Sequence, residues 1–365
     1  MFLSDYNSAI GIGRHYSEEV QLNLELLKAL TEVDGIPGRE ERVRELVIKT
    51  MTPLVDDISV DAMGNVIAHK AGSGPKVMIA AHMDEIGFVV KYIDDKGFLR
   101  LDPSGGFDPK TLIAQRVTVH TDDEDLLGII GSKPIHILSE EERKQPLKLT
   151  DLFIDLGLPA ETIHSKVNVG DFVTLEQDLK MVGDLACAKA LDDRVGVYVM
   201  IEAIRKLSNH QADIYAVATV QEEVGLRGAR TSGYGVNPDI GIALDVTVAA
   251  DVPDAKPHEH VTQLGKGAAI KVKDSSHISH HNLVKTFRKV AEAKGIPYQM
   301  EVLPFGGTDA AGMQMAREGK YAITLSIPTR YLHSVVEAAN VNDIQACVDL
   351  LAAYLESAHE HDVSY

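Results

Sequence analysis

Residues 76 to 84 have the sequence Lys76-Val77-Met78-Ile79-Ala80-Ala81-His82-Met83-Asp84, an apolar run that ends in a histidine and an acid. A short continuous apolar run of this kind is typical of a strand buried on both faces in a parallel sheet. Polar side chains at the carboxyl end of such a strand lie where open α/β sheets place their ligand sites. The run therefore predicts an α/β fold, with His82 as a candidate functional residue at a strand end.

Other places along the chain show the same arrangement, in which an acid or a histidine stands at an expected strand end beside a small-residue turn. The apolar run 213–220 leads into Glu222 and Glu223, and the run 239–244 leads into Asp245. Two imidazoles and three carboxylates suit two divalent ions if one carboxylate bridges them. The five candidate metal ligands are His82, Asp192, Glu223, Asp245 and His333.

Two more carboxyl groups, those of Asp84 and Glu222, stand beside the candidate ligands. A spare carboxylate next to a bound metal is what metal-assisted hydrolysis needs as a general base. A single histidine among the 15 of this chain is more often structural, and adjacent acids usually lie on a solvated face. Glu222 and Glu223 instead follow an apolar run and precede Gly225 and Gly228, which indicate a turn. Because buried acids cluster at functional sites, we interpret the set as a metal site.

Composition limits the class of protein and its partners. The chain has 36 basic and 54 acidic residues, a net charge of −18, which disfavours nucleic acid and anionic membranes as partners. The two cysteines, Cys187 and Cys347, are too few for a disulfide framework. No apolar stretch approaches the length of a membrane span, and the first residues lack the pattern of a signal peptide. We therefore expect a cytoplasmic protein that does not bind membranes.

The middle of the chain has a different pattern from the rest. From about residue 88 to residue 177, short β-type runs alternate with turn residues, which predicts an inserted β-rich domain. Its expected strands are 88–93, 98–101, 116–120, 127–130 and 171–175, and a charged stretch, 139–144, lies among them. His82 precedes this insertion and the other four candidate ligands follow it. Residues 1–87 and 178–365 are therefore expected to form one discontinuous catalytic domain.

Apolar residues at helical spacing predict helices outside the insertion. The expected helices include 17–29, 194–206, 282–294 and 342–357, with Asn342 as the cap of the last one. Residues 1–16 are expected to form a loosely structured extension. Buried strands that alternate with such helices are typical of the α/β class.

Taken together, these motifs resemble those of the M42 family of metallo-aminopeptidases, whose self-assembling members are called tetrahedral or TET aminopeptidases. The resemblance covers nearly the whole chain after the first 16 residues. It is carried by the segments 61–69, 76–87, 108–112, 221–229, 306–310 and 328–334. It implies an α/β fold of the dinuclear zinc aminopeptidase type, with a mixed central sheet and helices on both faces. A β-rich, barrel-like dimerisation domain, residues 88–177, would interrupt that fold.

The resemblance also implies a role for each candidate residue. Two triads would each hold one divalent ion and share a bridging acid; they are His82, Asp192 and Asp245, and Asp192, Glu223 and His333. Glu222 would be the general base for the attack of a metal-bridging water, and Asp84 would orient His82. Zinc or cobalt fits these ligands, and manganese is possible. In this family the peptide bond after the bridging acid, here Asp192-Asp193, is often cis.

Two further segments need an interpretation. Gly306 and Gly307 allow a close backbone approach, so this segment, with Asp309, is a candidate floor of the substrate pocket, although a structural turn explains the glycines nearly as well. Arg330 is a fourth candidate substrate-binding residue. The histidines at 277, 280 and 281 have no carboxylate partner at strand-end spacing, so we expect a loop near the active site and not a set of ligands.

The function implied by the resemblance is an aminopeptidase that removes amino-terminal residues from peptides, in a homo-oligomer whose dimers assemble into a hollow dodecamer. A simple dimer with an open site remains an alternative. So do a related deacylase or dipeptidase, some of whose relatives have been labelled glucanases, and a non-catalytic protein that kept the fold. A glycosidase would use two carboxylates without a metal, and the five metal-type ligands argue against it. We expect a neutral aliphatic amino-terminal residue in the substrate. Arg227 and Arg330 are the only basic residues beside the motifs that could pair with the side chain of a substrate glutamate.

Overall fold

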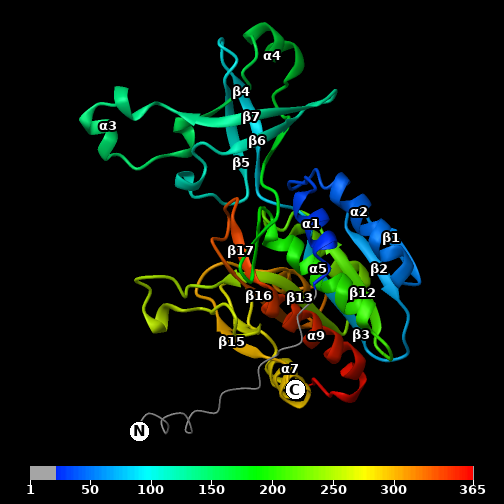
Figure 1. Ribbon diagram of the computed structural model, residues 1–365. Coiled ribbons are helices and arrows are strands. Elements are labelled where there is room, and N and C mark those ends of the chain that lie inside the picture. The colour runs from blue at the N-terminus through cyan, green and yellow to red at the C-terminus, as the bar shows by residue number, and fades with distance from the viewer. Residues whose placement is uncertain (1–21, 365) are drawn as a thin grey trace, which may run out of the picture.

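A mixed β-sheet forms the centre of the larger part of the molecule (Figure 1). The computed structural model describes residues 22–364, so the expected extension 1–16 and the first residues of the expected helix 17–29 lie outside the described residues. The sheet strands are β1 (Asp57–Val60), β2 (Val66–Lys70), β3 (Lys76–His82), β10 (Lys180–Val182), β11 (Leu185–Ala188), β12 (Asp213–Thr219), β13 (Ile240–Val248), β14 (Ala268–Lys273), β15 (Tyr298–Val302), β16 (Tyr321–Arg330) and β17 (Glu337–Asn340). Within the described residues their order is β1-β2-β12-β3-β13-β16-β17-β11-β10, and β14 joins β15 to β16.

The four central strands, β12, β3, β13 and β16, run parallel to one another. In the register of β12 and β3, Thr219 pairs with His82, the last residue of β3. In the register of β13 and β16, Asp245 pairs with Ser326. Since the carboxyl ends of parallel strands meet at one edge, the residues that follow these strands come together there.

Helices cover both faces of this sheet (Figure 1). They are α1 (Leu24–Glu32), α2 (Glu41–Met51), α5 (Leu191–Lys206), α6 (Arg227–Val236), α7 (His281–Lys294), α8 (Asp309–Gln314) and α9 (Val341–Ser357). Alternate residues of β3 take part in different cores: Val77 and Ile79 lie in the cluster that includes α5 and α9, whereas Met78 and Ala80 lie with α6 and α8. The expected α/β fold with a mixed sheet between two helical layers is confirmed.

Helix boundaries differ from the expectation where capping depends on one residue. The first described helix, α1, begins at Leu24, because the Asn23 side chain accepts a hydrogen bond from the N–H of Leu26. The cap of α9 is Asn340, whose side chain accepts the N–H of Asn342, so the expected cap at Asn342 is wrong. Asn342 already lies inside the helix.

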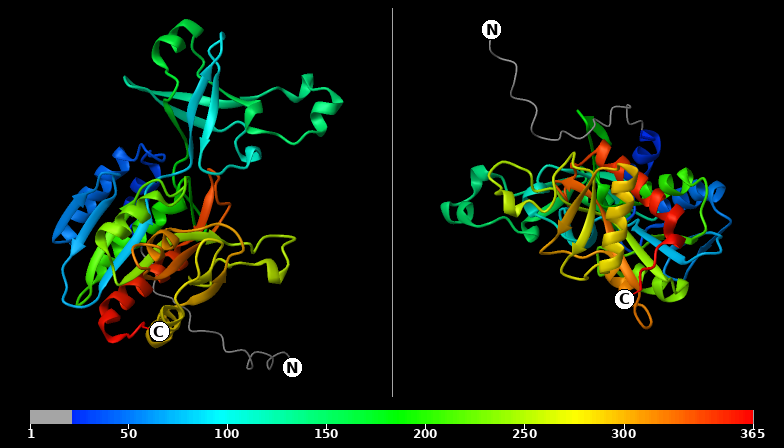
Figure 2. Two further views of the ribbon diagram at one scale, coloured as in Figure 1. Left: turned by 180° about the vertical axis from the view of Figure 1, so that it is seen from behind. Right: turned by 90° about the horizontal axis from the view of Figure 1, so that it is seen from below.

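A separate closed barrel stands above the sheet and is seen from behind and from below in Figure 2. Its strands are β4 (Gly87–Ile93), β5 (Leu99–Ser104), β6 (Arg116–His120), β7 (Asp125–Ser132), β8 (Leu152–Asp155) and β9 (Phe172–Leu175), in the closed order β4-β5-β8-β7-β6-β9. The barrel has its own core, which includes Phe88, Val119 and Val173. The strand β8 was not expected, and the charged stretch 139–144 forms a short helix, α3 (Glu140–Lys144), with a capping box from Ser139. A second helix, α4 (Ala160–Lys166), follows β8.

A buried arginine ties the loop after β3 to the helical layer. Arg194 of α5 has no solvent exposure, and its Nε donates to the carbonyl oxygen of Met83 at 2.7 Å. Its Nη1 donates to the carbonyl oxygens of Leu30 and Val33 at 2.6 and 2.7 Å. A charged donor with this many partners fixes the position of the chain that carries His82.

Among residues 22–364, none of the helices combines the length and the apolar character that a bilayer crossing requires.

Candidate metal centre

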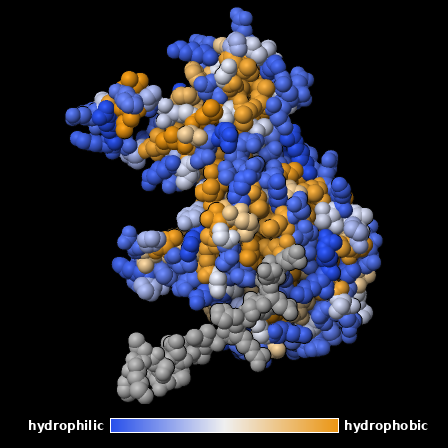
Figure 3. All heavy atoms as spheres, in the orientation of Figure 1, coloured by the Kyte–Doolittle hydropathy of each residue, from blue (hydrophilic) through white to orange (hydrophobic). Residues whose placement is uncertain are grey.

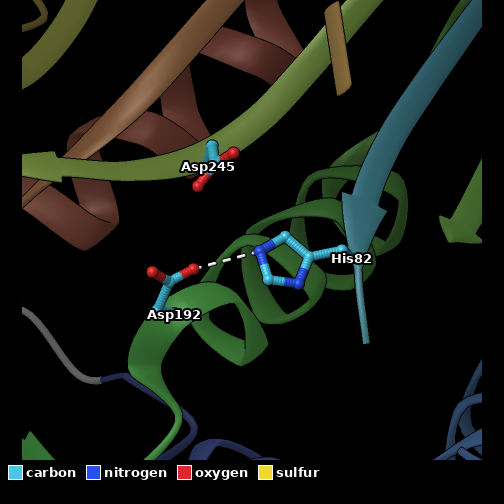
Figure 4. A group of neighbouring side chains, drawn as sticks. All are labelled: His82, Asp192 and Asp245. Carbon is cyan, nitrogen blue, oxygen red and sulfur yellow. Dashed lines mark hydrogen bonds and ion pairs between the residues drawn. The ribbon is translucent and has the colours of Figure 1, made fainter. Parts of the chain in front are cut away.

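The structure brings together all five residues that the sequence predicts as ligands. His82 ends β3, Asp245 lies near the end of β13, and Asp192 stands at the start of α5, where the backbone is not yet helical (Figure 4). Ligand atoms of these three residues all lie within 4.8 Å of one another, and the same holds for Asp192, Glu223 and His333. In the described part of the chain, these are the two groups of acid, histidine and cysteine side chains close enough to hold an ion.

Asp192 connects the two groups through its two carboxylate oxygens. Its Oδ1 lies 3.0 Å from Nε2 of His82, and its Oδ2 lies 3.3 Å from Nε2 of His333. The peptide bond between Asp192 and Asp193 is cis, as the family resemblance implied. One carboxylate that presents one oxygen to each imidazole has the arrangement of a bridging ligand.

Burial and charge at this site favour the binding of cations. His82 is 2 % exposed and Asp245 6 %, and the buried Oε1 of Glu223 has no hydrogen-bond partner. Burial raises the pKa of Glu223 to about 8, and burial together with the charge of Asp192 raises the pKa of Asp245 well above its ordinary value. Clustered buried carboxylates are costly unless a positive charge compensates them. The donor set and its unsatisfied charge therefore fit divalent cations.

The tautomer of His82 follows from its contacts. Its Nδ1 lies 3.0 Å from the backbone carbonyl oxygen of Asp84, which can only accept, so Nδ1 carries the proton. Nε2, 3.0 Å from Oδ1 of Asp192, is then the ring nitrogen that could bind a metal ion. The Asp84 carboxylate is farther from the ring, with Oδ1 3.6 Å from Nδ1.

The carboxylate of Asp84 instead holds the chain that carries the two adjacent glutamates. Its Oδ1 accepts the N–H of Glu222 at 3.0 Å and its Oδ2 accepts the N–H of Glu223 at 3.1 Å. The side chain of Glu222 reaches the same cluster, with Oε2 3.9 Å from Nε2 of His82. Burial raises the pKa of Glu222 well above its ordinary value. Asp84 therefore fixes Glu222 and Glu223 relative to His82.

Two buried acids beside the ligands were not predicted. The carboxylate of Glu337 accepts the N–H groups of Asp192 and His333, and the carboxylate of Asp193 accepts the N–H of His82 at 3.2 Å. Glu337 begins the apolar strand β17 four residues after His333, and an acid in that position was the only signal available in the sequence. Asp193 adjoins Asp192 in the sequence, but its hydrogen-bond partner, the N–H of His82, could be recognised only from the fold.

The four candidate substrate-binding residues lie in different surroundings. Gly306 and Gly307 line a pocket together with Asp192, Asp245 and His333. Asp309 does not line it; it is buried at the start of α8, where its carboxylate accepts from the Thr219 hydroxyl. Arg330 is bound to Asp251, with Nε 2.8 Å from Oδ1 and Nη2 2.8 Å from Oδ2.

The histidine-rich segment contacts the wall of this pocket, since the Ser275 hydroxyl donates to the carbonyl oxygen of Gly306, but its histidines belong to neither ligand group. The Nδ1 of His277 is 2.9 Å from Oδ2 of Asp274, so this histidine has a carboxylate partner three residues away. The expectation of no nearby carboxylate is therefore wrong. Asp274 accepts the N–H of His277 in a local turn, and this turn brings its carboxylate onto the ring of His277. The carboxylate of Asp274 also accepts the hydroxyl and the N–H of Ser276, which indicates a structural role in shaping the loop.

Comparison with known proteins agrees with this geometry. The model of the M42 glutamyl aminopeptidase family matches residues 64–350. The chain is 39 % identical to the lysyl aminopeptidase of Pyrococcus furiosus, over 93 % of this chain and 98 % of that one. The solved structure of an aminopeptidase from the archaeon Desulfurococcus kamchatkensis matches with a TM-score of 0.88 and 42 % identity, over 91 % of this chain and 94 % of that one. The Pyrococcus horikoshii TET1 peptidase matches with a TM-score of 0.81 and 36 % identity, over 91 % and 98 % of the two chains. This chain therefore belongs to the M42 peptidase family and is a hydrolase of peptide bonds.

Proposed function

We propose that this chain is a dinuclear, metal-dependent aminopeptidase that removes amino-terminal residues from peptides. The observation that carries the proposal is the position of Asp192, whose two oxygens face the imidazoles of His82 and His333 at 3.0 and 3.3 Å. His82, Asp192 and Asp245 would hold one divalent ion, and Asp192, Glu223 and His333 the other. Zinc or cobalt suits these imidazole and carboxylate donors, and manganese is a further candidate. Two such ions, when bound, polarise the scissile carbonyl and lower the pKa of water.

The chain's own contribution to the chemistry is proton transfer and positioning. Glu222 takes a proton from the attacking water and passes it to the leaving amine. Its position supports this role, because Glu222 adjoins the proposed ligand Glu223 and its Oε2 lies 3.9 Å from Nε2 of His82. Asp84 holds the backbone of Glu222 and Glu223 in place, and Glu337 does the same for Asp192 and His333.

The position of the pocket supports cleavage at the amino terminus of the substrate. Asp192, Asp245 and His333, members of the two proposed ligand groups, line the pocket, so a free α-amine there has a lone pair that could bind a metal ion and confine cleavage to the first residue. An acetylated amino terminus lacks that basic lone pair.

The experiment that tests this function compares one peptide with a free and with an acetylated amino terminus. The metal-loaded protein is incubated with each, and the released amino acids are identified by chromatography. Release of the first residue from the free peptide alone supports the proposal. Comparable cleavage of both peptides contradicts it, and release of acetate would indicate a deacylase.

We also propose that residues 88–177 form an assembly domain, separate from the catalytic residues 1–87 and 178–365. Exposed apolar side chains support this: Leu127 and Ile129 on β7 are 62 % and 54 % exposed, and Ile135 and Ile137 are 63 % and 66 % exposed. Figure 3 shows apolar residues on the barrel and on the arm that carries α3. The related TET1 peptidase is described as able to assemble into a tetrahedron or a large octahedral shell. Dimers that assemble into a dodecamer, in the cytoplasm, are the arrangement that we propose here.

A further inference from the structure

A pocket of about 1090 Å³ opens directly over the candidate ligands. Asp192, Asp245 and His333 form part of its wall, so a peptide bound for cleavage must lie within it. The backbone approaches closely here, since a Cβ added to Gly106 would lie 3.3 Å from Nδ1 of His333. The segment after β5 therefore brings the barrel to the edge of the pocket.

Apolar side chains from three parts of the chain surround this opening. Phe107 and Ile113 come from the barrel side, Val248 from the end of β13, and Phe305 and Tyr331 from the loops on either side of the sheet edge. Several of them are exposed in spite of their apolar character: Val248 is 39 %, Ile113 44 % and Phe305 79 % exposed. Large apolar groups around a cleft are typical of a site that binds an apolar part of a ligand.

Two basic side chains lie near the pocket, and neither is a buried cation within it. Arg330, which the sequence offered as a partner for an acidic substrate, forms two contacts of 2.8 Å with Asp251 and does not line the pocket. Lys110 and Asp108 line the rim of the pocket and are exposed to water, and Asp108 caps the short turn Pro109–Thr111 by accepting the N–H of Lys110. A glutamate or lysine side chain bound among the apolar residues would therefore lose its hydration without a buried partner, which is costly.

We propose that this pocket receives the side chain of the substrate's amino-terminal residue and selects large apolar residues such as leucine, methionine and phenylalanine. The inference rests on the proposed aminopeptidase function and names its substrate class. It sets this chain apart from the family description, which refers to glutamyl substrates, and from the lysyl aminopeptidase of Pyrococcus furiosus.

The test is a set of aminoacyl p-nitroanilides with one leaving group and different amino acids, assayed with the metal-loaded protein. We expect kcat/KM for the leucyl, methionyl and phenylalanyl substrates to exceed that for the glutamyl and lysyl substrates by at least about 10-fold, since pocket contacts of this kind discriminate by roughly 10- to 200-fold. A glutamyl or lysyl substrate that is cleaved as well as the leucyl one overturns the specificity and leaves the aminopeptidase function standing. If no substrate is cleaved, the proposed function fails as well.

A substitution in the wall of the pocket tests where the selection occurs. Val248→Lys should raise the ratio of glutamyl to leucyl kcat/KM by at least about 10-fold, because it places a cation beside the bound side chain. This ratio does not depend on how much of the variant folds. Val60→Lys is the matched control, since Val60 is 46 % exposed on β1, away from the pocket, and its ratio should not change. An unchanged ratio in Val248→Lys overturns the assignment of this wall.

The lysine at the rim provides the second variant. Lys110→Met should leave the preference for apolar residues intact, because the exposed Lys110 ammonium group stays hydrated and is not a buried partner for a substrate side chain. If the wild type prefers glutamyl substrates and Lys110→Met abolishes that preference, the rim cation determines specificity and the proposal is overturned.

Discussion

The carboxylate of Glu337 accepts a hydrogen bond from the backbone N–H of Asp192, with Oε2 2.9 Å from that nitrogen. Its Oε1 accepts the N–H of His333 at 2.7 Å. Glu337 is 2 % exposed, so these hydrogen bonds are shielded from water. One buried side chain therefore positions the backbone of two residues that we propose as metal ligands, one of which serves both ions.

Glu337→Gln should weaken metal binding by about 10- to 100-fold, the usual effect of losing a residue that orients ligands. The amide keeps one acceptor and turns an NH₂ group toward the other N–H. The affinity can be measured by competition with a coloured chelator. Asp343→Asn is the matched control, because Asp343 is also buried and accepts two N–H groups, those of Gly265 and Gly267 at 2.7 and 2.6 Å. Equal metal affinity in the two variants would contradict the positioning role.

Glu222→Gln should retain both metal ions and lose on the order of 10²- to 10⁴-fold in kcat, the usual contribution of a general base. Glu223→Gln should instead lose metal, because Glu223 belongs to a ligand group and its buried Oε1 has no hydrogen-bond partner. Elemental analysis of the purified variants separates the two effects. Near-normal turnover of metal-loaded Glu222→Gln refutes the assignment of the base.

The pH dependence of stability should include a contribution from Glu40, which is 1 % exposed. Burial raises the pKa of Glu40 from its ordinary value of 4.5 to about 7. Between these values the folded chain holds a proton that the unfolded chain releases, so the stability that this group contributes is full below the lower value and is lost as the pH rises to the higher one. The loss amounts to roughly 3 kcal/mol at most.

Glu40→Gln replaces the titrating carboxyl group with an amide that does not titrate, and it keeps the Oε1 acceptor for the N–H groups of Gly38 and Gln221. Relative to the wild type, the variant should become more stable as the pH rises from about 4.5 to about 7. Urea unfolding at several pH values measures the difference. Glu41→Gln is the control, because the side chain of Glu41 is 56 % exposed, and it should show no such trend. A constant difference between Glu40→Gln and the wild type argues against this origin.

Assembly should depend on the apolar surface of the barrel. Light scattering should give a mass near twelve subunits for the wild type and a smaller mass for the double variant Leu127→Glu, Ile129→Glu, since a charge on each exposed apolar side chain opposes contact between copies. Val60→Glu, a change at a position on β1 that is 46 % exposed, should not alter the mass. A wild type that remains a monomer with full activity contradicts the proposed compartment.

The sequence predicted which residues come together where the geometry follows from strand direction. His82, Glu223 and Asp245 could be placed together because the carboxyl ends of parallel strands meet at one edge. The β-rich insertion was visible in its short runs, although the strand β8 was not among the runs that we expected. The sheet order, with β12 between β2 and β3, follows from no local pattern.

The residues that support the ligands could not be predicted in the same way. Glu337 bonds to an N–H 145 positions earlier in the chain, and Arg194 donates to carbonyl oxygens of α1 and of the loop after β3, so neither contact has a local signature. Asp84 was expected to orient the ring of His82, and its carbonyl oxygen does lie 3.0 Å from Nδ1 of that ring; its carboxylate also accepts the N–H groups of Glu222 and Glu223, which was not expected. Such contacts depend on how the whole fold closes.

The central claim, that paired metal ions held by this cluster make the chain an aminopeptidase, is tested most directly by removing and restoring the metal. The protein is treated with a chelator, titrated with Zn²⁺ or Co²⁺, and assayed on a leucyl substrate while bound metal is counted. We predict no activity in the metal-free protein, recovery that reaches its plateau at two ions per chain, and no recovery in Asp192→Ala. Full activity in the metal-free protein would contradict the account.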